Sequence, residues 1–395
     1  MNFYATKISD KGDIAVDDTL LVKDVLCTAG SNILQGFTPL FSAEAVTRLV
    51  SVGYTISGKT HVGEFGLDLV GEFSNYSEKT DTLKGAAAEL VKEGKVKAAL
   101  GVDVNGAPRR AASISGVDFL KSTYGTVSRY GVVSTAASGE AVGVYAKDAV
   151  AVGEIMSKIA GYDSKDGTCQ NNEFEYDYSA TKDIKGKKVC IITELYEKCD
   201  DAIKAKIDSA AKILEKNGVQ VDRISSDIFS LAATAWQILY TAETCNNLSR
   251  YDGVKYGLRA KEYKNIDELY VNSRTEGFNF LTKAVILYGS DVLSKNRYKD
   301  CYDKALRVRR VVAEQLAEIL KTYSAVLTPA CSAAEYSAYN IADAFSKVFG
   351  ELEFTAIANL TGNPALVSSG VQFIGDYYKE GDLLCLANAI ERMGE

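Results

Sequence analysis

The sequence predicts an α/β protein in which a large, mixed and mostly parallel sheet is covered by helices on both faces. Apolar runs at 187–193 and 219–224 flank an amphipathic helix at 202–217, and such units place parallel strands side by side with the helix outside. The composition, 47% hydrophobic and 25% charged, is typical of a globular chain. The 395 residues suffice for a large core and contain no internal repeat. We therefore expect one domain over residues 1–395.

In the first half, apolar runs and glycines mark the expected elements in order. Residues 20–26 form a short strand-like run that ends in a turn at 27–30. Residues 43–52 have helical spacing, a glycine ends that helix, and residues 54–57 have the pattern of a strand. The alanine-rich segment 85–94 predicts a helix that also ends on a glycine.

In the second half, longer helices join the strand–helix–strand unit. Helices are expected at 146–159, 232–248 and 301–323, and a strand is expected at 325–329. Between the two halves, the polar residues 160–186 contain several glycines and asparagines. They predict an excursion over the surface.

Charge and composition exclude several classes of function. The net charge of −7 argues against direct binding of nucleic acid, which requires a basic surface. No apolar run has the length of a signal peptide or a membrane span, so we expect a cytoplasmic protein without a membrane partner. The single histidine and eight scattered cysteines predict neither a metal site nor a cofactor.

The segment Gly53–Thr60 matches the phosphate-binding pattern G-x-x-x-x-G-K-[ST]. A phosphate loop follows a strand and opens a helix, so that its N–H groups point at the anion. Here the expected order is helix, glycine, strand. Nucleotide binding therefore ranks below the functions considered next.

The chain is organised around residues 99–131. We interpret this stretch as a buried strand, a tight turn at Gly106 and a second strand that leaves the turn. Such an arrangement presents a residue at the bottom of a pocket, as in an active-site loop.

Three segments of the chain resemble motifs of the amidase signature family. These segments are Gly58–Phe65, Ala99–Arg109 and Ser249–Gly257. Within this family they are most similar to the A subunits of the glutamyl-tRNA(Gln) and aspartyl-tRNA(Asn) amidotransferases. The resemblance covers about residues 20–392 and implies a single amidase-like domain, shortened at its N-terminus relative to the family.

The resemblance also implies which catalytic positions have changed. The nucleophilic serine of the family corresponds to Ala107, and its bridging serine corresponds to Leu83. The base is retained as Lys59. An alanine has no lone pair with which to attack a carbonyl.

The same resemblance places the oxyanion loop at Val104, Asn105 and Gly106, where relatives have two glycines. We expect the flanking Asp103 and Arg109 to pair and support this loop.

The glutamine-binding positions of the family have changed as well. The arginine that would bind the substrate carboxylate corresponds to Ala284 or Val285, and the aspartate that would bind the amine corresponds to Leu352. None of these three apolar side chains can make the charged contacts with the substrate that an arginine or an aspartate would make.

These losses favour a catalytically inactive amidase homologue that acts by binding. Its partner would be a second copy of the chain, an amidotransferase-type subunit, or a small ligand. The alternative is an active amidase or glutamine amidotransferase subunit with a relocated nucleophile, for which Ser113, Ser115 and Cys27 are the candidates and Lys59 the base.

Overall fold

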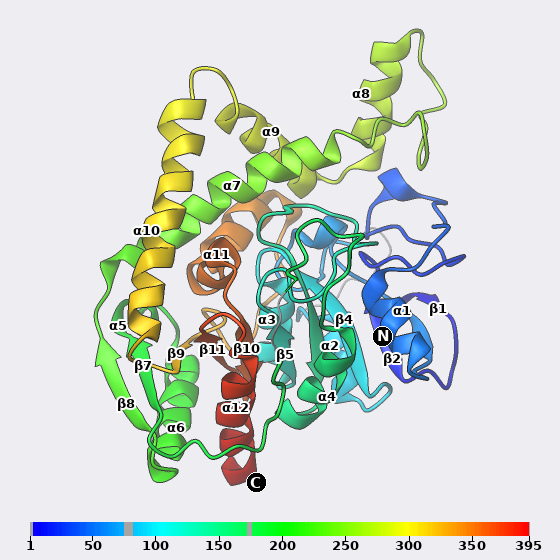
Figure 1. The fold of residues 1–395 in the computed structure, drawn as a ribbon. Coiled ribbons are helices and arrows are strands. Elements are labelled where there is room, and N and C mark those ends of the chain that lie inside the picture. Colours follow the sequence, from blue (N-terminus) through cyan, green and yellow to red (C-terminus); the bar gives the residue numbers. More distant parts are fainter. Residues whose placement is uncertain (1–2, 75–81, 172–175, 395) are drawn as a thin grey trace.

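The computed structural model describes residues 3–74, 82–171 and 176–394. Its centre is an 11-stranded mixed sheet with the strand order β1-β3-β2-β4-β6-β5-β10-β11-β9-β7-β8 (Figure 1). The strands are β1 (Tyr4–Lys7), β2 (Ile14–Asp17), β3 (Ile56–Thr60), β4 (Ala98–Asp103), β5 (Asp118–Lys121), β6 (Ala141–Ala146), β7 (Lys188–Ile192), β8 (Gln220–Ile224), β9 (Ala325–Thr328), β10 (Ala365–Ser368) and β11 (Val371–Gly375).

Helices cover the sheet on both faces (Figure 1). They are α1 (Glu44–Ser51), α2 (Ala86–Lys92), α3 (Ala107–Ser115), α4 (Ala149–Ile159), α5 (Thr193–Glu197), α6 (Asp201–Lys216), α7 (Ser230–Leu248), α8 (Ile266–Gly277), α9 (Phe280–Val292), α10 (Asp303–Leu320), α11 (Ala344–Thr361) and α12 (Glu380–Gly394). Shorter helical turns are η1 (Asn32–Leu34), η2 (Glu64–Gly66), η3 (Asp227–Phe229), η4 (Tyr298–Tyr302) and η5 (Ile341–Asp343).

The expectation of a mostly parallel sheet is wrong. Four strand pairs are parallel, which are β2–β3, β2–β4, β7–β8 and β7–β9. The six others found among the described residues are antiparallel. The strand–helix–strand units lie toward the two edges, whereas in the middle β6 lies antiparallel between β4 and β5, and β10 and β11 form a tight hairpin. Antiparallel strands need no helical crossover, so this part of the sheet has no strand–helix–strand signature in the sequence.

Several expected elements are confirmed with small shifts of their ends. The helices expected at 43–52, 85–94 and 202–217 are α1, α2 and α6, and the strands at 187–193 and 219–224 are the parallel pair β7 and β8. Their apolar periodicity is strong enough to fix the type of element.

Two expected strands are wrong. Residues 20–26 form no strand, because Asp24 has a positive φ of 61° and only Leu20 makes an isolated bridge. The first strand of the sheet's core is instead β2 at Ile14–Asp17, between β3 and β4. Residues 107–115, expected to belong to a second strand, form helix α3, with Pro108 in its first turn and Gly116 as its left-handed C-cap.

Residues 160–186 contain neither helix nor strand within the part that the structure describes, which omits 172–175. Two aspartates anchor the segment: the Asp163 carboxylate accepts a hydrogen bond from Ser128, and the Asp166 carboxylate accepts one from the Arg129 N–H. The last residues of the Gly53–Thr60 pattern belong to β3, so their N–H groups cannot cradle a phosphate as a strand-to-helix loop would. Among the described helices, none is long and apolar enough to cross a membrane.

Candidate functional site

The turn between β4 and α3 is the centre of the candidate site. Strand β4 ends at Asp103, and α3 begins at Ala107 directly after Gly106, whose φ is 89°. A Cβ atom at Gly106 would lie 2.3 Å from the Cβ of Thr355 on α11. Glycine is therefore required at this position for two reasons, which are its left-handed backbone and the close approach of α11.

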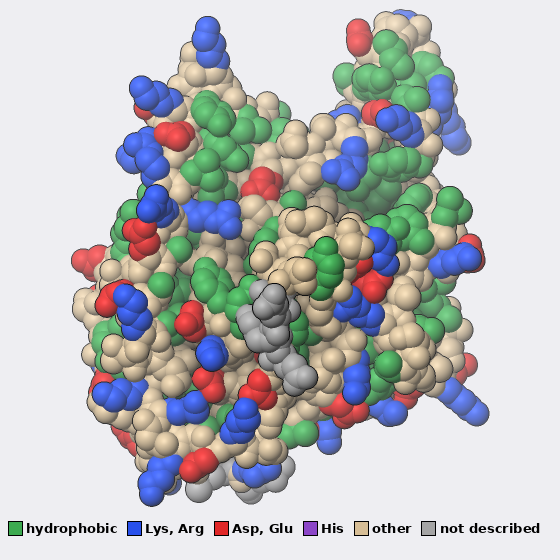
Figure 2. Space-filling view, in the orientation of Figure 1, with side chains coloured by type: hydrophobic (Ala, Val, Ile, Leu, Met, Phe, Trp, Pro, Cys, Tyr) green, Lys and Arg blue, Asp and Glu red, His purple; other side chains and the backbone are tan. Residues whose placement is uncertain are grey.

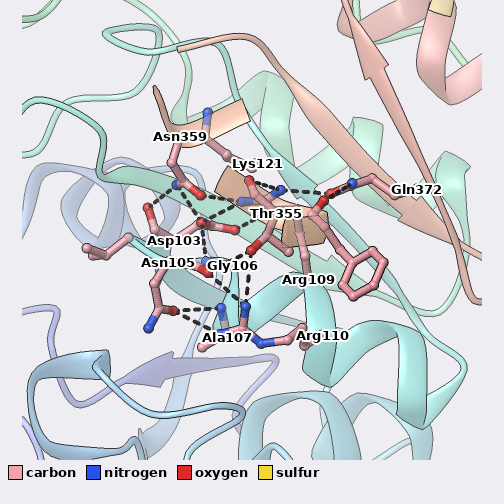
Figure 3. A network of polar contacts seen from close by, with 12 residues as sticks. Asp103, Asn105, Gly106, Ala107, Arg109, Arg110, Lys121, Thr355, Asn359 and Gln372 are labelled. Atoms are coloured by element: carbon pink, nitrogen blue, oxygen red, sulfur yellow. Dashed lines mark hydrogen bonds and ion pairs between the residues drawn. The ribbon is translucent and has the colours of Figure 1, made fainter. Parts of the chain in front are cut away.

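A buried polar network holds the back of this turn (Figure 3). The guanidinium of Arg109 donates to both carboxylate oxygens of Asp103, at 2.7 and 3.1 Å, and also to Thr355, Gln372 and Asn359. The expected pair of Asp103 and Arg109 is thus present, with both side chains fully buried. Burial alone would raise the pKa of Asp103, but the adjacent Arg109 holds it below its usual value.

Two backbone donors of the turn are occupied by side chains. The Gly106 N–H donates to Asp103 Oδ1 at 3.1 Å, and the Ala107 N–H donates to Asn105 Oδ1 at 3.0 Å (Figure 3). Asn105 is itself held, because its amide donates to the Leu67 carbonyl and its Oδ1 also accepts from Arg110. An oxyanion hole needs donors that point at the reacting oxygen. In this structure the donors of the turn point at protein acceptors.

The third residue of the predicted oxyanion loop, Val104, is buried, and its carbonyl accepts a hydrogen bond from the indole of Trp236 at 3.0 Å. It thus ties the turn to helix α7.

Ala107 lines a small, partly open cavity of about 30 Å³. The polar side chains in its lining are Asp17, Thr19, His61, Asp68 and Tyr145. Small residues of α2, which are Ala86 and Ala87, form another part of the wall. The cavity therefore joins the end of β2, the start of α3 and α2.

Lys59 does not face this cavity. The Thr60 hydroxyl donates to Asp17 Oδ1 at 2.9 Å, so Thr60 and Asp17 share one face of the sheet. Because neighbouring residues of a strand point to opposite faces, Lys59 points to the other one. There its ammonium donates to Asp18 Oδ1 at 2.9 Å, with both side chains buried. Lys59, the predicted base, is thus not among the described residues that line the cavity with Ala107.

The surroundings of Lys59 also oppose its use as a base. Burial on its own lowers the pKa of Lys59, but the charge of Asp18 raises it above the usual lysine value. A lysine must be neutral to accept a proton. Lys59 is therefore held in its protonated form.

Four further predicted positions lie away from the cavity. Leu83 is buried, and its N–H donates to the Tyr336 carbonyl. On α9, Val285 is buried and Ala284 is partly buried. Leu352 is buried on α11, one turn before Thr355. None of the four is among the described residues that line the cavity.

The candidates for a relocated nucleophile are engaged elsewhere. Ser113 and Ser115 lie on α3 and donate to the Gly370 carbonyl and the Glu89 carboxylate. The thiol of Cys27 donates to the Asp18 carbonyl at 3.0 Å. Burial raises the pKa of Cys27 to about 11, which keeps it a thiol near neutral pH.

Sequence reasoning missed the polar residues of the cavity, Asp17, Thr19 and His61. The signal that could have found them is the run Ile14–Val16 followed by two aspartates and a threonine. In the structure Asp17 is buried at the end of β2 and faces the cavity with Ala107. Burial raises the pKa of Asp17 to about 7, although its hydrogen bond from Thr60 opposes that rise.

Comparisons with known proteins give one consistent result. The family described as Amidase matches residues 13–384. Among curated proteins, the A subunit of the glutamyl-tRNA(Gln) amidotransferase of Agathobacter rectalis is 33% identical over an alignment that covers 97% of this chain and 80% of that protein. The protein of the same name from Thermotoga maritima is 31% identical over an alignment that covers 96% of this chain and 83% of that protein.

Solved structures agree with the sequence comparisons. The crystal structure of the A subunit of the Thermotoga maritima glutamyl-tRNA(Gln) amidotransferase superimposes with a TM-score of 0.81 and 26% identity, covering 99% of this chain and 87% of that one. A peptide amidase in complex with chymostatin shares the fold, with a TM-score of 0.77 and 21% identity, covering 96% of this chain and 82% of that one.

Proposed function

The chain belongs to the amidase family, and from this premise we propose that it is a catalytically inactive member that acts by binding a partner or a small ligand in the cytoplasm. The observation that carries the proposal is Ala107, which offers only a methyl group to the cavity. A nucleophile and its base act as a unit, and the loss of one removes most of the rate.

Two features around Ala107 support the proposal. The backbone donors of Gly106 and Ala107 are bonded to protein acceptors, so substrate oxygen would have to compete with them. The ammonium of Lys59 lies on the opposite face of the sheet in an ion pair with Asp18. Restoring a serine at position 107 alone would therefore not restore a catalytic pair.

Binding of a partner protein is supported by the surface and by the relatives. The relatives are named as A subunits of amidotransferases. On the face shown in Figure 2, hydrophobic side chains gather around the two projections that contain α8 and α10. Val271 on α8 is 62% exposed and Leu287 on α9 is 71% exposed. Exposed apolar side chains grouped in this way are typical of surfaces that bind protein.

The first experiment measures amide hydrolysis by the purified chain over a panel that includes glutamine and simple amides. We expect no turnover by the unmodified protein. We also expect none from the Leu83→Ser, Ala107→Ser double variant, because no lysine faces the cavity among the described residues. A triple variant that adds Asp17→Lys puts a lysine into the lining of the cavity that position 107 also lines, and it is the variant with which we test for a gain of activity.

The proposal would be overturned if the unmodified protein hydrolysed amides and if this activity stayed with the protein, at constant specific activity, through purification. The alternative function, an active amidase or glutamine amidotransferase subunit, would then hold. Ser113→Ala and Cys27→Ala variants would then identify its nucleophile.

Lys59→Ala is expected to lower stability, since it leaves Asp18 as an unpaired buried charge.

Binding between copies is tested by light scattering of the chain over a range of concentrations. If the exposed Leu287 of α9 takes part in self-association, Leu287→Glu yields the monomer mass at concentrations where the unmodified protein does not. Glu318→Gln, on the exposed face of α10 in an i,i+3 pair with Lys321, serves as the control. A monomer mass for the unmodified protein at all concentrations would exclude self-association and leave a different partner.

A further inference from the structure

The cavity beside Ala107 has acidic side chains in its lining. Its lining includes two carboxyl groups, those of Asp17 and Asp68, and no lysine or arginine among the described residues. Asp68 is held by the protein, because its two oxygens accept hydrogen bonds from the N–H groups of Gly71 and Phe73. Asp17 also accepts a hydrogen bond, from the Thr60 hydroxyl to its Oδ1, and it is the carboxyl group that lies two residues from Thr19.

A second, independent feature points to a ligand at the same place. Thr19 is 4% exposed and lines the cavity, yet within the described residues its hydroxyl oxygen has no hydrogen-bond partner. A buried hydroxyl without a partner is costly unless a ligand or water satisfies it. Asp17 is the last residue of β2, Thr19 follows two residues later in a turn, and both line the cavity.

The size and chemistry of the cavity define the class of ligand. A volume of about 30 Å³ holds about two water molecules. No group of three or more histidine, cysteine, aspartate or glutamate side chains in the described part of the chain could hold a metal ion. A carboxylate and a hydroxyl oxygen are acceptors that match the N–H donors of an ammonium group.

We propose that this cavity binds a small primary ammonium ion, either ammonium itself or a short alkylammonium, with the Asp17 carboxylate and the Thr19 hydroxyl as its ligands. The inference rests on the proposed function, because it assigns a ligand class to a cavity that no longer performs catalysis. Gly101 permits this geometry, since a Cβ atom there would lie 3.0 Å from Asp17 Oδ2 and 2.9 Å from the Tyr145 ring.

The test measures binding to the full chain by calorimetry and by the rise in melting temperature. The probes are ammonium chloride and methylammonium chloride, compared with sodium chloride and tetramethylammonium chloride at the same ionic strength. We expect saturable binding of the first two only. Tetramethylammonium has the same charge but is too large for the cavity and has no N–H donor.

Three variants assign the binding to the cavity. Asp17→Asn keeps the shape and removes the charge, so we expect affinity to fall about tenfold or more. Thr19→Val removes only the hydroxyl and is expected to weaken binding by a few fold. Asp118→Asn is the matched control, because Asp118 is also a buried carboxyl group with a raised pKa but does not line the cavity. Its affinity should equal that of the unmodified protein.

The outcomes separate this inference from the proposed function. Equal effects of all four salts, or equal affinities of the unmodified protein and both Asp17→Asn and Thr19→Val, would overturn the ammonium site. Amide hydrolysis measured on the same preparations would overturn the proposed function instead. A protein that neither binds ammonium nor turns over amides would refute only the ammonium site.

Discussion

The two sides of the turn between β4 and α3 are built in different ways. Behind the turn, Arg109 satisfies Asp103, Asn359 and Gln372 in a fully buried network. In front of it, the cavity has a methyl group at Ala107 and a hydroxyl at Thr19 that lacks a partner among the described residues.

This difference shows that the residues that hold the turn in place and the residues that would perform chemistry are separable. The back of the turn follows the expectation for an amidase-like loop, whereas the front does not. We expect substitutions behind the turn to affect stability, and substitutions in front of it to affect ligand binding. The two sides should also give opposite pH dependences of stability.

The largest expected effect comes from breaking the network behind the turn. Arg109→Ala leaves Asp103 as an unpaired buried charge and is expected to lower the free energy of unfolding by about 3–5 kcal/mol. Urea denaturation followed by circular dichroism measures this change. Arg310→Ala, which breaks the exposed pair with Glu314, should have little effect. Similar stabilities for the two variants would contradict the role of the network.

The next effect is a dependence of stability on pH that comes from Asp17, in front of the turn. The folded-state pKa of Asp17 is about 7, above the value of about 3.9 in an unfolded chain. Between these values the folded state binds more protons, so the contribution of Asp17 to stability falls as pH rises from about 4 to 7. In the Asp17→Asn variant, the decrease in the free energy of unfolding over this pH range should be smaller by up to about 4 kcal/mol. An unchanged pH profile of the free energy of unfolding would show that Asp17 ionises normally.

Behind the turn, Lys121 should give the opposite pH dependence. Burial lowers its pKa to about 7, so the unfolded state binds more protons between about pH 7 and 10. Its contribution to stability therefore rises with pH in that window, and Lys121→Met should flatten the rise. The same urea denaturation series, carried out at about pH 7, 8 and 9, measures it. A slope that is unchanged in the variant would contradict this assignment.

A smaller effect is expected from closing the space between the turn and α11. Gly106→Ala combines a left-handed backbone with a contact of 2.3 Å to Thr355 and should cost about 3 kcal/mol. Gly116→Ala has the same backbone strain at φ 73° but open space around it, so it should cost about 1 kcal/mol. Thermal unfolding of both variants measures the difference. Equal losses would mean that the close approach of α11 carries no cost.

The smallest effect is expected from the front of the turn. Ala107→Ser adds one hydroxyl at the edge of the cavity and should change the free energy of unfolding by less than about 0.5 kcal/mol. We also expect it to leave amide turnover absent. A large gain of activity from this single change would show that a base still faces position 107.

Strong apolar periodicity let the sequence predict several elements with small errors at their ends. The strand–helix–strand unit of β7, α6 and β8 was predictable because it repeats apolar residues with clear periods. Strand β2 was missed because it is only four residues long and precedes a longer apolar run at 20–26. Helix α3 was missed because its serines and alanines fit both a helix and a strand leaving a turn.

The sequence by itself determined the family motifs, the alanine at position 107 and the pair of Asp103 and Arg109, because these depend on residue identity and short spacing. Only the tertiary structure decided which side chains share the cavity. Lys59 and Thr60 are neighbours in sequence but point to opposite faces of β3, so one pairs with Asp18 and the other with Asp17. That division follows from strand register, which brings together residues more than 40 positions apart and which no local pattern specifies.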